Sequence, residues 1–259
     1  MKRLYIVSSG AGGTKYLTTE AKEALADSEM IVSYTKYAKE LKEFIGDKEL
    51  YKSGMTKEIE RCDKAIEYAR AGKTTALISN GDVNVFAMAT LVVELMDEKD
   101  CWDEIEMISI AGVTSFFAAA SRIGAPISQD FAVISLSDRL TDIAVIDKRV
   151  KNSLEADFVI GIYNPKSKSR IKPYQQFLSS LSQIDERIVI VASNVGRDTE
   201  KITVTSSSDL VAKDIDNELV SMSTLIIVCN SSTRMTKNGL VLTPRGYLKK
   251  YELDGELKE

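Results

Sequence analysis

Short runs of apolar residues recur along the chain and alternate with stretches of helical periodicity, and this alternation restricts the fold more than any other feature. The runs that predict strands are residues 4–7, 30–32, 74–78, 105–110, 131–135, 158–162, 188–191 and 225–228. Most of them are near-continuous in Val, Ile and Leu, which is typical of strands covered on both faces in a mainly parallel sheet. The pattern therefore predicts an α/β protein.

The segments between these runs predict helices. Ile59, Cys62, Ile66 and Ala69 form one apolar stripe, and a glycine follows shortly after its end. Residues 86–96 and 113–123 each follow a strand and a turn in the same way.

A length of 259 residues leaves room for two domains. Glycine and proline at positions 124 and 126 interrupt the last of these helices before a new strand opens. We therefore expect an N-terminal α/β domain over residues 1–125 and a C-terminal α/β domain over residues 126–259.

Composition excludes several classes of protein. A hydrophobic content of 44% and a charged content of 28% are those of a globular chain. The net charge of −4 provides no overall positive field for nucleic acid or an anionic membrane. No secretion signal and no apolar stretch of about 18 residues is apparent, so we expect a cytoplasmic protein.

The chain has no histidine, so imidazole chemistry is excluded. Its cysteines Cys62, Cys101 and Cys229 lie far apart in the sequence and form no metal-binding pair. We expect buried, reduced thiols and no metal site in the protein.

Three glycine-containing turns follow predicted strands and precede helices, at residues 8–14, 79–82 and 111–115. In open α/β sheets, ligands bind beyond the carboxyl ends of strands, where glycine lets a ligand approach the backbone. The alternative is that the glycines only make tight turns. A dinucleotide fingerprint is disfavoured, because Lys15 stands at its third glycine and Ser33 and Tyr34 stand where an acidic residue is required.

These turns, together with motifs further along the chain, resemble the tetrapyrrole (class III) methyltransferases, which use S-adenosyl-L-methionine. In the first half the resemblance rests on residues 8–19, 53–55, 79–82 and 112–115. In the second half it rests on D-F-A-V-I-S-L-S-D at 130–138, Y-N-P-K-S at 163–167, N-S-S-T-R at 230–234 and T-P-R-G-Y at 243–247. It spans about residues 3 to 247 and points to the corrin branch of the family.

The resemblance implies two α/β domains with a ligand cleft between them, usually in a homodimer. It also implies methyl transfer to C17 of precorrin-3B or cobalt-factor III, with ring contraction, in cobalamin biosynthesis. Another tetrapyrrole methylase of the same fold and a non-catalytic tetrapyrrole-binding relative remain alternatives. The sequence leaves open whether the substrate contains cobalt.

The resemblance also suggests site residues. Those expected to bind the methyl donor are Ala11, Asn80, Gly81, Asp82, Val83, Thr114, Ser115, Asn164 and Asn194. Asp82 and Asp138 are the catalytic candidates, although each could instead cap the following helix, and Asp130 or Tyr163 could carry protons in their place. The substrate has many carboxylates, so we expect it to meet Arg139, Lys166, Lys168, Arg197, Arg234 and Arg245, unless the lysines are only a solvated surface.

The chain departs from the family at several loop positions. Ala11, Val83 and Ala111 stand where prolines are usual, and Gln129 stands where histidine is frequent. Each missing proline removes a preset φ angle, so we expect looser loops and weaker donor binding.

Overall fold

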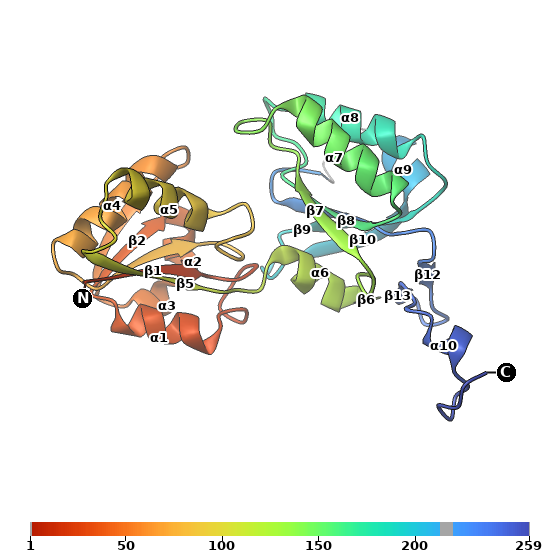
Figure 1. The fold of residues 1–259 in the computed structure, drawn as a ribbon, viewed down its shortest axis with the longest axis horizontal. Coiled ribbons are helices and arrows are strands. Elements are labelled where there is room, and N and C mark those ends of the chain that lie inside the picture. Colours follow the sequence, from red (N-terminus) through yellow and green to blue (C-terminus); the bar gives the residue numbers. More distant parts are fainter. Residues whose placement is uncertain (1, 213–219, 259) are drawn as a thin grey trace. The chain divides into compact units, whose positions relative to one another are not determined.

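The computed structural model describes residues 2–212 and 220–258 (Figure 1). By their contacts these residues form two compact units. The first runs up to Ala118 and also includes Gly196–Asp198, and the second comprises Ala119–Val195 and the residues from Thr199 onward. The division by contacts falls within α6 (Ser115–Ile123), whereas the sequence suggests a boundary at 125/126.

The first unit is built on a five-stranded sheet in the order β3-β2-β4-β1-β5. The strands are β1 (Lys2–Ser8), β2 (Met30–Tyr34), β3 (Glu49–Ser53), β4 (Thr75–Ser79) and β5 (Ile105–Ile110). Every pairing in this sheet is parallel. All of its strands therefore end at the same edge, and the turns after β4, β1 and β5 are neighbours there.

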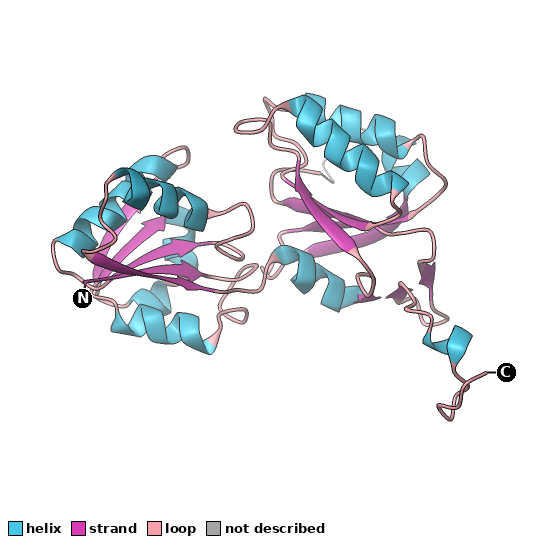
Figure 2. Cartoon of the chain, viewed as in Figure 1, coloured by secondary structure: helices cyan, strands magenta, loops and turns pink. Residues whose placement is uncertain are grey.

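Helices cover both faces of the first sheet (Figure 2). Helices α4 (Glu58–Arg70) and α5 (Met88–Glu98) pack on one face over side chains such as Leu4, Ile6 and Leu77. Helices α1 (Thr19–Asp27), α2 (Thr35–Glu40) and α3 (Lys42–Ile45) pack on the other. Burial on both faces explains why these strands are apolar at successive positions.

The second unit contains a five-stranded sheet in the order β10-β9-β11-β8-β7. The strands are β7 (Phe131–Ser135), β8 (Val159–Tyr163), β9 (Ile188–Ser193), β10 (Lys201–Ser206) and β11 (Thr224–Val228). Helices α7 (Ile143–Glu155), α8 (Lys172–Leu181) and α9 (Ser207–Ala212) share one hydrophobic core with it. A small sheet of β6 (Gly124–Ala125), β12 (Arg234–Met235) and β13 (Val241–Leu242) and the short α10 (Tyr247–Lys250) complete the unit.

The structure confirms the eight predicted strands and the α/β class. The expectation of mainly parallel pairing is right for the first sheet and wrong for the second, where only β7 and β8 pair in parallel. Strand β11 is buried at every position although both of its neighbours are antiparallel to it. A continuous apolar run therefore reports burial and not strand direction.

Two longer strands were missed by the sequence pattern. Strands β3 and β10 are sheet edges and include exposed charged residues, Glu49, Lys52 and Lys201 among them, which dilute the apolar signal. Within the described residues, no helix is long and apolar enough to cross a membrane.

Candidate active site

The turns after β1 and β4 are joined by backbone hydrogen bonds. The Gly10 amide donates to the Gly81 carbonyl at 3.1 Å, and the Gly81 amide donates back to the Gly10 carbonyl at 2.7 Å. Both glycines have positive φ, 75° and 72°, a region that other residues rarely adopt. A β carbon at Gly10 would also lie 2.5 Å from Cβ of Tyr16. Glycine is thus required for these two turns to meet.

Side chains strengthen the same junction. Ser8, fully buried at the end of β1, accepts a hydrogen bond on Oγ from the Val83 amide at 2.9 Å. Asp82 accepts from the Gly112 amide at 2.9 Å and from the Asn84 amide at 2.8 Å. The Asp82 carboxylate therefore ties the turn after β4 to the turn after β5.

Asp82 does not cap the helix that follows it, which is the alternative role expected from the sequence. The next helix, α5, has Ala87 at its N-cap position and no side-chain cap. The carboxylate has two oxygens with about four acceptor positions, so it can accept a further hydrogen bond from a ligand.

The third turn approaches the other two closely. A β carbon on Gly112 would lie 2.3 Å from Cβ of Ser8 and 2.6 Å from the Gly81 carbonyl oxygen. One on Gly81 would lie 3.8 Å from Oγ1 of Thr114. The structure thus gathers at one sheet edge the donor-site residues predicted in this unit, which are Ala11, Asn80, Gly81, Asp82, Val83, Thr114 and Ser115.

Arg197 is part of this edge as well. Its guanidinium bonds both carboxylate oxygens of Glu40, the Ala11 carbonyl and the Asn80 side chain. The sequence predicts Arg197 as a substrate-binding residue, and its observed partners all belong to the first unit.

In the second unit, Asn164 and Asn194 follow β8 and β9, two strands that run in the same direction because β11 is antiparallel to both. Both asparagines have a φ of 50°, a left-handed conformation that asparagine tolerates better than most residues. The Asn164 side chain donates to Oγ of Ser135 at 3.0 Å, and the backbone N–H of Asn194 donates to the Ser223 carbonyl at 3.2 Å.

Arg170 organises the same edge of the second sheet. It donates to the carbonyls of Leu136 and Asn164, each at 2.8 Å, and lies 3.9 Å from the Asp138 carboxylate. Burial lowers the pKa of its guanidinium from the ordinary value. Asp138 is not the cap of α7, since Asp142 accepts the capping hydrogen bond from the Ala144 amide.

The other predicted substrate-binding residues lie in exposed or half-exposed segments. Arg139, Lys168, Arg234 and Arg245 are exposed, and Lys166 is half-buried with its ammonium 5.6 Å from the Tyr174 ring centre. The structure leaves their contact with a substrate as a prediction.

All three cysteines are buried. Burial raises the pKa of Cys62 and of Cys229 to about 12 and also raises that of Cys101. These thiols are protonated at neutral pH and poor nucleophiles. Among the described residues, no three His, Cys, Asp or Glu side chains gather as a metal site.

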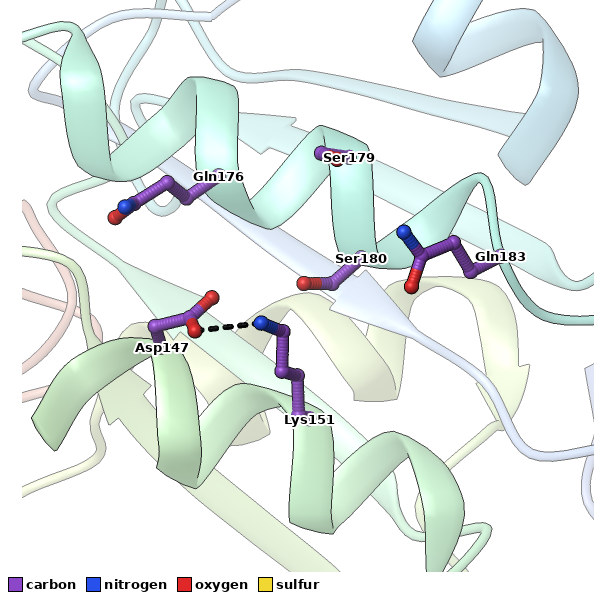
Figure 3. A pocket seen from close by; sticks show the side chains of 6 residues that line it. All are labelled: Asp147, Lys151, Gln176, Ser179, Ser180 and Gln183. Carbon is purple, nitrogen blue, oxygen red and sulfur yellow. Dashed lines mark hydrogen bonds and ion pairs between the residues drawn. The ribbon is translucent and has the colours of Figure 1, made fainter. Parts of the chain in front are cut away.

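A shallow polar depression lies between α7 and α8 (Figure 3). Its lining residues are Asp147, Lys151, Gln176, Ser179, Ser180 and Gln183. Lys151 contacts Asp147, one turn earlier on α7, at 2.7 Å (Figure 3). The depression lies in the helical layer, and none of the predicted site residues lines it.

Sequence reasoning missed two contributors to the first sheet edge. Ser8 lies inside a recognised motif, but nothing in the motif indicates which of its side chains holds Val83. Glu40 ends α2 and meets Arg197 from 157 positions away in the chain, so no local pattern could identify it.

Comparison with known proteins extends these findings. The sequence model of the Tetrapyrrole (Corrin/Porphyrin) Methylases matches residues 3–211. A Salmonella typhimurium protein named probable cobalt-factor III C(17)-methyltransferase is 42% identical, over 94% of this chain and 99% of that protein. A Methanocaldococcus jannaschii protein of the same name is 38% identical, over 96% and 100%.

A Sinorhizobium protein named precorrin-3B C(17)-methyltransferase is 36% identical, over 94% of this chain and 96% of that protein. The crystal structure of the methyltransferase CobJ superimposes with a TM-score of 0.85 at 29% identity and covers 94% of this chain. The chain therefore belongs to the tetrapyrrole methylases, C-methyltransferases whose methyl donor is S-adenosyl-L-methionine.

Proposed function

We propose that this chain transfers a methyl group from S-adenosyl-L-methionine to C17 of precorrin-3B or cobalt-factor III, with contraction of the macrocycle, as a step of cobalamin biosynthesis. The observation that carries the proposal is identity of 36–42% over nearly the whole length with relatives named for this reaction. The interlocked turns of the first unit support it, because they follow neighbouring parallel strands at the sheet edge where ligands of open α/β sheets bind.

The donor site in this proposal uses the turn residues already gathered at the first sheet edge. The assigned residues are Ala11, Asn80, Gly81, Asp82, Val83, Thr114 and Ser115, with Asn164 and Asn194 from the second unit. Glycine at positions 10 and 112, where Tyr16 and Ser8 occupy the space of a β carbon, lets the three turns meet at this edge, and the Asp82 carboxylate there can accept a further hydrogen bond. The residues present thus fit S-adenosyl-L-methionine, which supplies an already activated methyl group.

The main task left to the protein is alignment. Correct placement of two reactants can supply about 7–11 kcal/mol of the barrier in favourable cases. Asp82 is rigidly held by two backbone amides, so it suits an orienting role at the donor. Asp138 remains the proposed proton-handling group on the second unit, next to Arg170.

The substrate carboxylates are assigned to Arg139, Lys166, Lys168, Arg234 and Arg245. A guanidinium can bind a carboxylate through two parallel hydrogen bonds, which gives both affinity and orientation. We also infer a cytoplasmic homodimer of two α/β domains, 1–125 and 126–259, that needs neither nucleic acid nor membrane. Light scattering of the purified protein tests the dimer.

The test of the reaction is an anaerobic incubation with methyl-labelled S-adenosyl-L-methionine and either cobalt-factor III or precorrin-3B. Product mass and visible absorbance are followed. Label on the cobalt substrate supports the cobalt-dependent reaction, and label on precorrin-3B alone supports the metal-free one. No label on either, with both reactants intact, overturns the proposal.

A non-catalytic, tetrapyrrole-binding role is the second candidate, and the missing loop prolines favour it. Titration with S-adenosyl-L-methionine separates the two, since a carrier would not bind the donor at millimolar concentration.

A further inference from the structure

Residues 196–198 follow β9 of the second unit in the chain but belong by their contacts to the first unit. Gly196 has a φ of 82°, and a β carbon there would lie 2.8 Å from the Gly12 carbonyl oxygen and 2.9 Å from Cε2 of Tyr16. A β carbon on Gly13 would lie 3.1 Å from the Gly196 carbonyl oxygen. The 196–198 segment therefore lies directly against the turn after β1.

This segment brings the Arg197 guanidinium to the donor-site turns. Nε and Nη2 donate to the two carboxylate oxygens of Glu40 at 2.9 and 3.2 Å. Nη1 donates to the Ala11 carbonyl at 3.2 Å, and Nη2 also donates to Oδ1 of Asn80 at 3.0 Å. One side chain thus holds the turn after β1 and the turn after β4.

The Arg197–Glu40 pair is largely shielded from water. The side chains are 18% and 21% exposed, so their attraction is screened less than that of a surface pair. Tyr37 lies on the same helix as Glu40. Burial raises the pKa of its phenol, and the nearby charge of Arg197 acts in the opposite direction. Because Glu40 accepts hydrogen bonds from both Nε and Nη2, it is the charged partner that fixes the orientation of the guanidinium.

These partners leave Arg197 little capacity for a substrate. A guanidinium has five N–H donors in a fixed fork, and four hydrogen bonds to Glu40, Ala11 and Asn80 are already made. A bidentate contact with a tetrapyrrole carboxylate would require breaking at least one of these four hydrogen bonds.

We propose that Arg197 is a positioning residue for the methyl-donor site, oriented by Glu40, and not a ligand of the tetrapyrrole. The inference rests on the proposed function, because it takes the turns after β1 and β4 as donor-binding. The hydrogen bonds from Arg197 restrain the Ala11 backbone and the Asn80 side chain, and so hold the two turns in place.

The test compares Arg197→Lys, Glu40→Gln and the double variant with the parent chain. Lysine keeps the charge but not the forked geometry. A matched control is Arg187→Lys, since Arg187 is similarly shielded at 12% exposure and pairs with Asp157 at 3.3 Å in the second unit. Circular dichroism establishes that each variant is folded.

We expect Arg197→Lys to weaken S-adenosyl-L-methionine binding by roughly 10- to 100-fold, the scale of lost hydrogen bonds to a charged group. The KM for the tetrapyrrole should change by less than about twofold, since only donor-site geometry is affected. Glu40→Gln should weaken donor binding in the same direction, and the double variant should lose less than the product of the single losses, because both changes break one interaction.

An increase in the tetrapyrrole KM with unchanged donor affinity would overturn the inference in favour of direct substrate binding. Equal losses of donor affinity in Arg197→Lys and Arg187→Lys would also overturn it, since the effect would then be general destabilisation. If the parent chain itself fails to bind S-adenosyl-L-methionine, the proposed function fails, and this result is distinct from the other two because it precedes any variant.

Discussion

Gly112→Ala is the sharpest test of how the three turns interlock. The added methyl group would lie 2.3 Å from Cβ of Ser8 and 2.6 Å from the Gly81 carbonyl oxygen, where ordinary contact begins at 3.4 Å. Both obstacles belong to rigid parts of the molecule, so the turn after β5 would have to move by about 1 Å, a shift of the kind that overpacking forces in a dense interior.

The cost is expected at about 1–3 kcal/mol of unfolding free energy, the range of overpacking substitutions. The same displacement would lengthen the hydrogen bond from the Gly112 amide to Asp82, now 2.9 Å. We therefore expect S-adenosyl-L-methionine affinity to fall by about tenfold or more, which corresponds to about 1.4 kcal/mol.

Urea unfolding and calorimetric titration measure the two effects. Gly54→Ala is the matched control, because a β carbon at Gly54 meets nothing within 4 Å and its φ is not in the left-handed region. The interlocked arrangement of the turns is refuted if the unfolding free energy of Gly112→Ala lies within about 0.5 kcal/mol of that of Gly54→Ala, the scale of ordinary surface substitutions, and both variants bind the donor equally well.

Three further outcomes are expected. Asp82→Asn keeps a single acceptor oxygen for the Gly112 and Asn84 amides, so donor affinity measured by calorimetry should fall by roughly tenfold. The control Asp142→Asn, at a helix cap, should leave donor affinity unchanged. Equal donor affinities in the two variants would argue against the orienting role of Asp82. Arg170→Lys gives up the contacts to Leu136 and Asn164 and should lower the unfolding free energy by about 1–3 kcal/mol. Arg149→Lys, at an exposed site, is the control and should leave it unchanged. Equal unfolding free energies in the two variants would contradict a stabilising role of Arg170. Cys62 and Cys229 have folded-state pKa values of about 12, above those of unfolded thiols, so their contribution to stability is complete below about pH 9 and is lost as pH rises towards 12. In urea unfolding, the double alanine variant should lose less stability than the parent over that pH range. Rapid thiol modification of the native protein at pH 8 would contradict the burial of these thiols.

Much of the architecture could be predicted from the sequence because burial leaves a local signal. Strands such as β1, β4 and β11 are apolar at successive positions, and the stripe on α4 repeats with helical spacing. Strand direction in the second sheet could not be predicted, since a strand covered on both faces looks the same in either orientation. The edge strand β3 was missed because Glu49 and Lys52 face solvent.

The turns of the first unit were predictable as a set because parallel strands must end at one edge. Their connections were not, since they depend on contacts between residues distant in sequence. The Asp82 carboxylate reaches an amide 30 positions away, and Arg197 reaches Ala11 across 186 positions. Ser8, Glu40 and Arg170 act through similar long-range contacts, which only the folded chain reveals.

The central claim is that this chain methylates C17 of a corrin precursor, and the position of the transferred carbon tests it most directly. The chain is incubated anaerobically with cobalt-factor III or precorrin-3B and S-adenosyl-L-methionine carrying a ¹³C-methyl group, and the product is examined by carbon NMR. We predict one enriched methyl resonance, assigned to a methyl group bonded to C17 of a contracted ring. Enrichment at another carbon, or an unlabelled macrocycle in the presence of intact donor, would contradict it.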